Sequence, residues 1–507
     1  MLDILFVHPN ASKKIYQELS NSHSAIEPPI WAAMLANSVR SSGYNTWILD
    51  TEVEQLDYEE SVNTIALFNA RIVCFVVYGQ QPSASSQNME GAVGIANLLK
   101  KHYPNTFILF VGAHVAALPI ETLIKEESID AVCQNEGVYT IRDLLKIDNL
   151  QDNSLLSKIK GLCYRSRNSK FIFTNPSMDI VPKDRLEIDL PGMAWDMLPD
   201  LKKYRTAGWH SWTNNSNKSP FASIYTSLGC PYRCSFCMIN IINRTNSEEH
   251  ISSADSNYFR YWSPDFIIKQ FDYLADKGIT NIKIADELFV LNPNHFLKIC
   301  KMIKDRGYKF NIWAYSRVDT CKPQYLDALK EAGVNWLALG IENPNTIIRK
   351  EIHKDGFKDI KILDLINLIH SHDIEIAANY IFGLPNDTKE SMEFTLNFAK
   401  NNLTAMANFY SAMAYPGSPL YLQAKSKGLE LPKNYVGYSQ HAYETLNISN
   451  ENLSSAEILK FRDYAWENFH SDSNYLDLLK NKFGNDAKDN VENMLKIKLK
   501  RKLLHIN

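Results

Sequence analysis

The sequence predicts an α/β protein in which an open parallel sheet precedes a partial (β/α)6 barrel and a helical C-terminal extension. Residues 2–147 alternate short β-branched runs with longer amphipathic stretches, which is the βαβ rhythm of an open parallel sheet. A second alternation, with six strand-helix repeats, runs from residue 221 to about residue 416 and indicates a partial barrel. Beyond Gly417 the chain is polar and helical, without a strand signal.

The first alternation resolves into five strands and three clear helices. We expect the strands at 2–8, 45–50, 72–77, 106–112 and 131–136. The helices are expected at 29–42, 83–101 and 138–145. Ligands of open α/β sheets bind at the carboxyl ends of the strands. That rule selects the residues His8, Tyr78, Gly79, Gly112, His114, Glu136 and Gly137.

A connecting segment is predicted between the two alternations. Residues 148–217 begin with a polar stretch and a hairpin-like pair around 161–165 and 170–174, and continue through Pro182, Pro191 and Pro199. Aromatic side chains cluster near the end of this segment and just beyond it, where they either line a pocket or pack at an interface. They are Trp209, His210, Trp212, Tyr258, Tyr261 and Trp262.

The second alternation divides in the same way. Its strands are expected at 221–227, 281–286, 310–315, 336–341, 375–382 and 406–415. Helices are expected at 264–277, 293–306, 323–332 and 388–401, and most begin with a Pro or Thr suited to a first turn. The predicted organisation has four parts, at 1–147, 148–217, 218–430 and 431–507.

Composition narrows the class of protein. The chain has 507 residues, 45% of them hydrophobic, and a net charge of only −3, so no overall field favours a nucleic acid. There is no pattern of a secretory signal, and the longest apolar run, at 107–118, is too short to span a membrane. We expect a cytoplasmic protein. Basic and apolar residues alternate at 496–502, which is more typical of a solvated helix end than of a lipid contact.

Three of the eight cysteines lie close together in the sequence, as Cys230, Cys234 and Cys237. Three thiolates at this CxxxCxxC spacing can bind three irons of a four-iron four-sulfur cluster and leave the fourth iron without a protein ligand. Zinc would require a fourth close ligand, and core cysteines need no fixed spacing. The other five cysteines are scattered among mostly apolar neighbours and are expected in the core.

This cysteine motif, with an aromatic residue, Phe236, just before the last Cys, resembles the radical SAM superfamily with its TIM-like barrel. The resemblance implies that Glu287 binds the amino group of S-adenosylmethionine (SAM), although Asp286 or Glu287 could also cap a helix. By the same resemblance, Arg317 would contact the carboxylate of SAM, or else form a surface ion pair. Glu342 would accept hydrogen bonds from the ribose, and Gly383 and Pro385 would lie beside the adenine.

The N-terminal sheet resembles the Rossmann-like cobalamin-binding domain found in part of this superfamily. The resemblance rests on the Gly112, His114 and Pro119 loop and on the Glu136-Gly137 turn. The chain departs from other cobalamin proteins because the Asp-x-His-x-x-Gly motif, whose histidine binds cobalt, is absent. We therefore do not assign His114 as a cobalt ligand, and a loop histidine bonded to backbone is an equal alternative.

Together these resemblances imply a cobalamin-dependent radical SAM enzyme, similar to class B methyltransferases. We expect methyl transfer to an unactivated carbon by means of a 5′-deoxyadenosyl radical and methylcobalamin. The alternatives are a cyclase or oxidoreductase with the same cofactors, and a non-catalytic cobalamin or iron-sulfur sensor. The expected partners are a small-molecule, saccharide or lipid-linked substrate and an electron donor such as flavodoxin or ferredoxin, with neither a nucleic acid nor a membrane.

Overall fold

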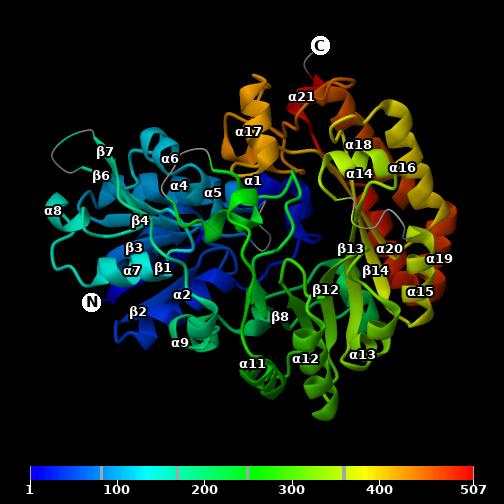
Figure 1. Ribbon diagram of the computed structural model, residues 1–507, viewed down its shortest axis with the longest axis horizontal. Coiled ribbons are helices and arrows are strands. Elements are labelled where there is room, and N and C mark those ends of the chain that lie inside the picture. The colour runs from blue at the N-terminus through cyan, green and yellow to red at the C-terminus, as the bar shows by residue number, and fades with distance from the viewer. Residues whose placement is uncertain are drawn as a thin grey trace.

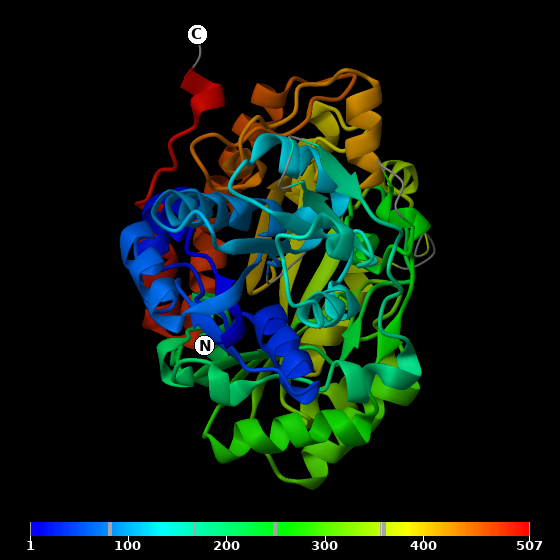
Figure 2. The ribbon, with the colours of Figure 1, turned by 90° about the vertical axis from the view of Figure 1, so that its left-hand side faces the viewer.

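The computed structural model describes residues 2–79, 84–166, 169, 171–246, 251–354, 356 and 361–505. Two sheets dominate it: a seven-stranded sheet near the N-terminus and a six-stranded sheet in the second half of the chain. Figure 1 shows the first sheet on the left and the second on the right, and in Figure 2 the first lies in front of the second. The mixed α/β architecture predicted from the sequence is confirmed.

The N-terminal sheet has the strand order β2-β1-β3-β4-β5-β6-β7, and β1 to β5 are parallel. The strand order reverses between β1 and β3, so the carboxyl ends of these two strands flank the topological switch point. The strands are β1 Leu2–His8, β2 Thr46–Asp50, β3 Ala70–Val76, β4 Phe107–Val111, β5 Ala131–Cys133, β6 Leu162–Arg165 and β7 Ile172–Thr174.

Helices cover both faces of this sheet because alternate strand residues point to opposite sides. Ile4 and Phe6 pack with α2 and α7, whereas Leu5 and Val7 pack with α3 and α4. The helices are α1 Ser12–Tyr16, η1 Gln17–Asn21, α2 Ile30–Ser41, α3 Tyr58–Phe68, α4 Ala84–His102, α5 Ala113–Ala117, α6 Pro119–Lys125, α7 Val138–Leu145 and α8 Asn153–Leu156. Of the expected helix 83–101, Ser83 lies outside the described residues.

The hairpin predicted in the connecting segment forms, but it joins the N-terminal sheet. Strand β6 pairs antiparallel with β5, and β7 pairs with β6, so the sheet continues past residue 147. Lys170 of the predicted hairpin lies outside the described residues. The rest of the segment holds η2 Lys183–Arg185, α9 Leu186–Asp189, η3 Trp195–Met197, η4 Leu201–Lys203, α10 Gly208–Ser211 and η5 Trp212–Asn214.

The second sheet is entirely parallel and follows chain order from β8 to β15, as expected of an open barrel. Its strands are β8 Phe221–Ile224, β11 Asn281–Ile284, β12 Asn311–Arg317, β13 Val334–Glu342, β14 Glu375–Phe382 and β15 Met406–Ser411. The sequence did not predict the short ribbon of β9 Ser227–Leu228 and β10 Arg260–Tyr261, because two-residue strands carry no periodicity.

Proline and hydroxyl residues begin the barrel helices as predicted. The Ser263 side chain caps α11, with Pro264 in its first turn, and Thr388 caps α16. The helices are η6 Ile239–Asn243, η7 Ser253–Asp255, α11 Pro264–Asp276, α12 Pro293–Asp305, η8 Pro323–Tyr325, α13 Leu326–Glu331, α14 Thr346–Glu351, α15 Ile362–Ser371 and α16 Lys389–Asn401.

The C-terminal region is helical and packs on the last barrel strand. Its helices are α17 Pro419–Ser426, η9 Tyr435–Tyr438, α18 Ser455–His470, α19 Ser473–Phe483, α20 Asn485–Leu495 and α21 Lys502–His505. Buried Arg462 of α18 donates to the Phe409 carbonyl of β15 at 2.8 Å. Among the described residues, no helix is both long and apolar enough to cross a bilayer.

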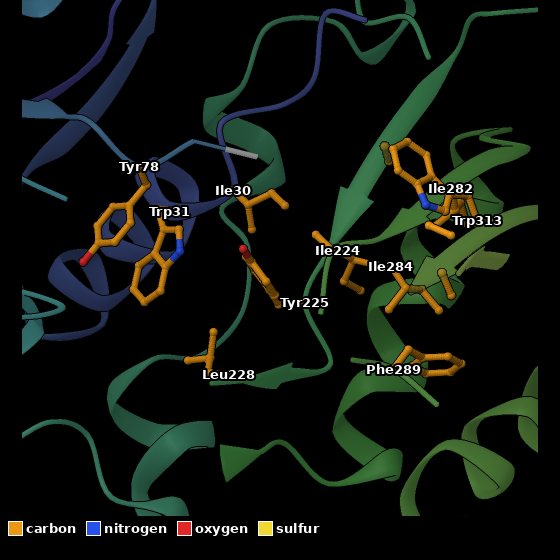
Figure 3. Packing of buried hydrophobic residues seen from close by; sticks show 14 of the residues in the cluster. Ile30, Trp31, Tyr78, Ile224, Tyr225, Leu228, Ile282, Ile284, Phe289 and Trp313 are labelled. Atoms are coloured by element: carbon orange, nitrogen blue, oxygen red, sulfur yellow. The ribbon is translucent and has the colours of Figure 1, made fainter. Parts of the chain in front are cut away.

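One hydrophobic core continues from the first sheet into the barrel. Trp31 of α2 stacks on Tyr78 at 4.3 Å between ring centroids, and Tyr225, directly after β8, meets Trp31 edge-on at 6.4 Å. Figure 3 shows these three rings between the two domains, with Ile224 and Ile284 on the barrel side. The scattered cysteines, at 74, 133, 163, 300 and 321, are buried, as predicted.

Candidate active site

The loop that follows β9 holds the three clustered cysteines in a fixed conformation. The Asn240 side chain accepts from the Cys230 amide at 3.0 Å and donates to the Cys230 carbonyl at 2.8 Å. Gly229 has φ +82°, and a Cβ at this position would lie 2.0 Å from the Tyr258 carbonyl oxygen. Only glycine fits there, so the entry of the cysteine loop is set by sterics.

The three thiols are half-buried, and they lie close enough together to raise one another's pKa. Burial raises the pKa of Cys230 to about 12, and burial together with the other two thiols raises the pKa of Cys237 further. Such thiols ionise only beside a strong positive charge, which a bound metal centre provides. Within the described residues, no group of three or more His, Cys, Asp or Glu side chains is placed to hold one metal ion. A cluster suits this spacing better, because each thiolate binds a different iron.

Asp286 and Glu287, adjacent beyond β11, have different surroundings. Asp286 accepts hydrogen bonds from the Thr226 amide, the Thr226 hydroxyl and the Ser227 hydroxyl at 2.5 to 2.6 Å, so it anchors the strand that leads into the cysteine loop. Glu287 is half-buried, and its Oε2 is inaccessible to solvent and has no hydrogen-bond partner among the described residues. Burial raises the pKa of Glu287 to about 8. A carboxylate on the cavity wall with one unpaired buried oxygen fits a cationic ligand group.

Arg317, at the end of β12, lies against the cysteine loop. Its Nη1 donates to Cys234 Sγ at 3.4 Å, and its guanidinium stacks 3.7 Å from the centroid of the Tyr232 ring. Its Nε and Nη2 bind both carboxylate oxygens of Asp319, at 2.8 and 2.9 Å. The bidentate guanidinium face predicted to bind a cofactor carboxylate is therefore bound to Asp319. The remaining nitrogen, Nη1, is directed to the Cys234 thiol.

Glu342, at the end of β13, forms a buried ion pair with Lys354. Glu342 has φ +61°, and the pairing with β14 shifts register between Gly340 and Glu342. A Cβ on Gly340 would lie 2.7 Å from Glu342 Oε1 and from Lys354 Nζ. The glycine thus makes room for the ion pair. The sequence did not indicate Lys354, because nothing in its local pattern distinguishes it from a surface lysine.

These groups meet at one cavity of about 790 Å³ between the two domains. The barrel contributes the predicted Phe236, Cys237, Glu287, Arg317 and Glu342. The N-terminal domain contributes residues beyond the carboxyl ends of β1, β2 and β3 and from α4. They include His8, Pro9, Glu52, Gly79, Gln87 and Asn88. The cavity therefore opens onto the switch point of the N-terminal sheet, the position expected of its ligand.

The four residues predicted to contact cobalamin do not line this cavity within the described part of the chain. Gly112 has φ +157°, and a Cβ there would lie 2.5 Å from the Val77 carbonyl oxygen. His114 is buried, with Nδ1 2.9 Å from the Ser86 hydroxyl and its ring edge-on to Tyr435. Burial lowers the pKa of His114 to about 3. Loop resemblance selected the ends of β4 and β5, whereas the strand order places the switch point at β1 and β3.

Glu136, beside Gly137, which precedes α7, binds the barrel instead of facing the cavity. Its Oε2 pairs with Arg260 Nη2 at 2.6 Å, with both side chains essentially inaccessible to solvent. Its Oε1 accepts from the Val181 amide at 2.6 Å. Arg260 belongs to β10, which pairs with β9 next to the cysteine loop. Glu136 therefore links the first sheet to the strand that positions the loop.

The turn that contains Gly383 and Pro385 also lies outside the cavity lining. Gly383 has φ +76°, and its amide donates to Asp387 at 2.9 Å. Ile458 of α18 packs within 2.6 Å of where a Cβ would stand. The structure thus gives this turn a packing role, and its predicted place beside the adenine stays a prediction.

Most of the aromatic side chains near the connecting segment pack at interfaces. Only Trp209 of the six lines the cavity, where it meets Trp313 at 4.6 Å between centroids. His210 binds Thr206 and the Asn311 carbonyl, and Trp262 donates to the Leu190 carbonyl. The sequence missed other lining residues, including Lys283 of β11 and Glu27 before α2, because only the fold brings them together.

Two protein families match the chain, in the order that the sequence predicts. The B12 binding domain matches residues 21–145, and the Radical SAM superfamily matches residues 224–399. An uncharacterized methyltransferase of Pyrococcus horikoshii is 28% identical over 443 residues, covering 87% of this chain and 86% of its own length. An anaerobic magnesium-protoporphyrin IX monomethyl ester cyclase of Cereibacter sphaeroides is 21% identical, covering 90% and 68%.

Solved structures share the fold. The radical S-adenosylmethionine methyltransferase TsrM from Kitasatospora setae, with tryptophan and a SAM analog bound, superposes with a TM-score of 0.62 at 15% identity, covering 84% of this chain and 77% of that one. OxsB, a cobalamin-dependent S-adenosylmethionine radical enzyme, gives 0.62 at 15% identity, covering 98% and 72%.

With its B12 binding domain ahead of a radical SAM domain, this chain belongs to the B12-dependent radical SAM enzymes. Its cofactors are a four-iron four-sulfur cluster, SAM and cobalamin. The residues at and beside the cavity fit them: Cys237 of the clustered thiols lines the cavity, Glu287 has an unpaired buried oxygen there, and the cavity opens at the switch point.

Proposed function

We propose that this enzyme transfers a methyl group to an unactivated carbon of a small molecule. The observation that carries the proposal is a cavity that both domains share. Cys237 and Glu287 line it from the barrel, and His8 and Gly79 line it from the N-terminal domain. Methyl transfer needs the radical-forming group and the methyl carrier to reach one substrate carbon. The names of the methyltransferase relatives agree with this proposal.

On this proposal, Cys230, Cys234 and Cys237 hold the cluster, and Arg317 stabilises the Cys234 thiolate by its hydrogen bond. Glu287 binds the ammonium group of SAM, which supplies the partner that its Oε2 lacks. Glu342, held by Lys354, accepts hydrogen bonds from the ribose. The buried walls exclude water around these groups. Together the bound cofactors supply a carbon-centred radical and a methyl group, and the chain positions and shields them.

Cobalamin is placed at the switch point of the N-terminal sheet on this proposal. His8, Glu52 and Gly79 lie there and line the cavity. His8 Nε2 stands 3.4 Å from Glu52 Oε2. The His8 side chain is thus directed to Glu52. Burial lowers the pKa of His8, but the Glu52 hydrogen bond and the nearby acids raise the pKa overall. The site is then supported by residues that lie outside the cavity lining, namely Gly112, His114, Glu136 and Gly137.

The proposed substrate is a small molecule, of saccharide or lipid-linked type, and the proposed electron donor is flavodoxin or ferredoxin in the cytoplasm. A deletion strain of the source organism tests the methyl transfer. Its metabolites are compared with those of the parent after growth on methyl-deuterated methionine. A parent metabolite that carries the label and is replaced in the deletion strain by a form one methyl group lighter supports the proposal. A missing metabolite replaced by an uncyclised or unoxidised precursor with the same methyl count contradicts it.

Cyclisation is a second candidate, because relatives named as anaerobic magnesium-protoporphyrin IX monomethyl ester cyclases cover up to 90% of this chain. The two reactions differ in their co-products. A methyl group taken from SAM leaves S-adenosylhomocysteine, whereas a cyclase has no use for that step. S-adenosylhomocysteine in a turnover mixture therefore separates the two functions.

A further inference from the structure

Part of the cavity lies beyond the groups proposed to hold the cofactors. Lys283 of β11 and Trp313 of β12 are register partners at the base of the barrel lumen. Further up, small residues occupy three cavity-lining positions of β13 and β14, namely Ala338, Gly340 and Ala377, and the larger Asn379 and Ile381 line the cavity closer to the carboxyl end of β14. Barrel interiors are normally filled by bulky branched side chains. Small residues here leave the lumen open toward its base.

Lys283 brings a charge to this base, with 2% of its side chain exposed. Its Nζ lies 3.1 and 3.2 Å from the carboxylate oxygens of Glu27, which also accepts from the Ser223 hydroxyl at 3.0 Å. The ammonium stands 4.6 Å from the centroid of the Trp313 ring. A buried ion pair adds little net stability compared with apolar residues of similar size. Its place on a cavity wall is therefore better explained by ligand recognition.

The C-terminal tail forms another wall of the same cavity, and it presents apolar side chains there beside Lys498. Met494, Ile497 and Leu499 line it together with Trp466 of α18. The tail is held in place beyond this wall, where Arg501 forks onto Asp463 at 2.8 and 2.9 Å. The Gln17 side chain fixes the Lys500 backbone, since it donates to the Lys500 carbonyl at 3.1 Å and accepts from the Lys500 amide at 3.2 Å. The tail predicted as a solvated helix end is thus a fixed part of the cavity.

We propose that this part of the cavity binds an amphipathic substrate, with one acidic group, a carboxylate or a phosphate, at Lys283 and an apolar body against the tail. The inference rests on the proposed function for calling the ligand a substrate. Glu27 acts as the counter-ion of Lys283 while the site is free and competes with the acidic group of the substrate. This competition sets the sign of the test: the loss of the Glu27 charge strengthens binding of an acid, whereas the loss of the Lys283 charge weakens it.

The test is equilibrium dialysis of the reconstituted holoenzyme against decanoate, decyl phosphate and decanol. These probes share an apolar chain and differ in the head group. We expect one or both acids to bind roughly tenfold or more tightly than decanol, because a hydrogen bond to a charged group contributes about 1.5 to 3 kcal/mol. The better acid shows whether the natural head group is closer to a carboxylate or to a phosphate.

Four single variants and one double variant complete the design. Lys283→Met should reduce binding of the acids to the level of decanol, and Glu27→Gln should increase it. Leu499→Glu should weaken all three probes. Lys100→Met is the matched control: Lys100 pairs with Asp130 in the N-terminal domain, outside the cavity, and its loss should leave the binding of all three probes unchanged. Iron and cobalamin contents show that each variant is folded, and the Glu27→Gln/Lys283→Met double variant removes the pair without leaving a buried charge.

Equal binding of acids and decanol by the native holoenzyme overturns the proposal. So does a Glu27→Gln variant that binds acids as poorly as Lys283→Met, because the ion pair would then be only structural. The assay needs no turnover, so its outcome is independent of methyl transfer. Acid-selective binding without any methylated product would contradict the proposed function alone.

Discussion

Replacement of Glu136 by Gln tests whether this residue links the domains or contacts cobalamin. Glu136 and Arg260 form an ion pair with exposed fractions of 1% and 0%, and Arg260 also donates to the Val181 carbonyl at 2.6 Å and to Asn243 at 3.0 Å. Removal of one partner of a buried pair leaves a buried charge uncompensated and costs about 3 to 5 kcal/mol. Gln keeps one hydrogen bond, so we expect a loss near 3 kcal/mol.

The assay is urea unfolding of the cofactor-free protein, with Glu121→Gln as the matched control. Glu121 also joins the two halves of the chain, through Lys425 at 2.7 Å, but both side chains are nearly half exposed. A surface pair of this kind contributes less than about 1 kcal/mol. In the Glu136→Gln/Arg260→Met double variant the loss should be smaller than the sum of the single losses. Unchanged stability of Glu136→Gln, together with weaker cobalamin binding, would refute the linking role.

Three further predictions follow from single sites. Gly229→Ala should lower the iron content of the reconstituted enzyme because its Cβ would meet the Tyr258 carbonyl. The control Gly278→Ala, at φ +70° with open space around it, should cost only about 1 to 2 kcal/mol of stability and keep the iron. Equal iron contents in both variants would contradict this prediction. Glu287→Gln should weaken SAM binding about tenfold or more in calorimetry without destabilising the apoprotein, and unchanged affinity would exclude Glu287 from the SAM site. The pKa of His114 is lowered to about 3, so the unfolded chain binds more protons than the native chain between about pH 3 and 6.5, and stability is lost as the pH falls through this window. The stability advantage of the native protein over His114→Gln should therefore shrink by up to about 1.4 kcal/mol per pH unit. A constant difference would show that His114 is not buried in its neutral form.

The sequence predicted the elements of both sheets because their periodicity is local. The five parallel strands and the six barrel strands match the expected segments, although 406–415 ends as a strand at Ser411. The hairpin at β6 and β7 was expected in a connector, because pairing with β5 depends on contacts across the chain. Periodicity finds strands but does not assign their partners.

The site shows the same division between local and distant information. Cys230, Cys234 and Cys237 are a local motif, and Glu287, Arg317 and Glu342 follow barrel strands, so their strand-end positions were predictable. Lys354, Lys283 and Glu27 reach the cavity only through the tertiary fold. The four predicted cobalamin contacts do not line the cavity and stay predictions, and the strand order that fixes the switch point cannot be read from loop resemblance.

The most direct test of methyl transfer at this shared cavity is whether two co-products accumulate together. The reconstituted enzyme is incubated anaerobically with a reductant, methyl-deuterated SAM and a metabolite extract of the deletion strain. We predict that S-adenosylhomocysteine and 5′-deoxyadenosine both accumulate with a deuterated product, and that Cys234→Ala forms none of the three. Formation of 5′-deoxyadenosine and product without S-adenosylhomocysteine or label in the product would contradict the account.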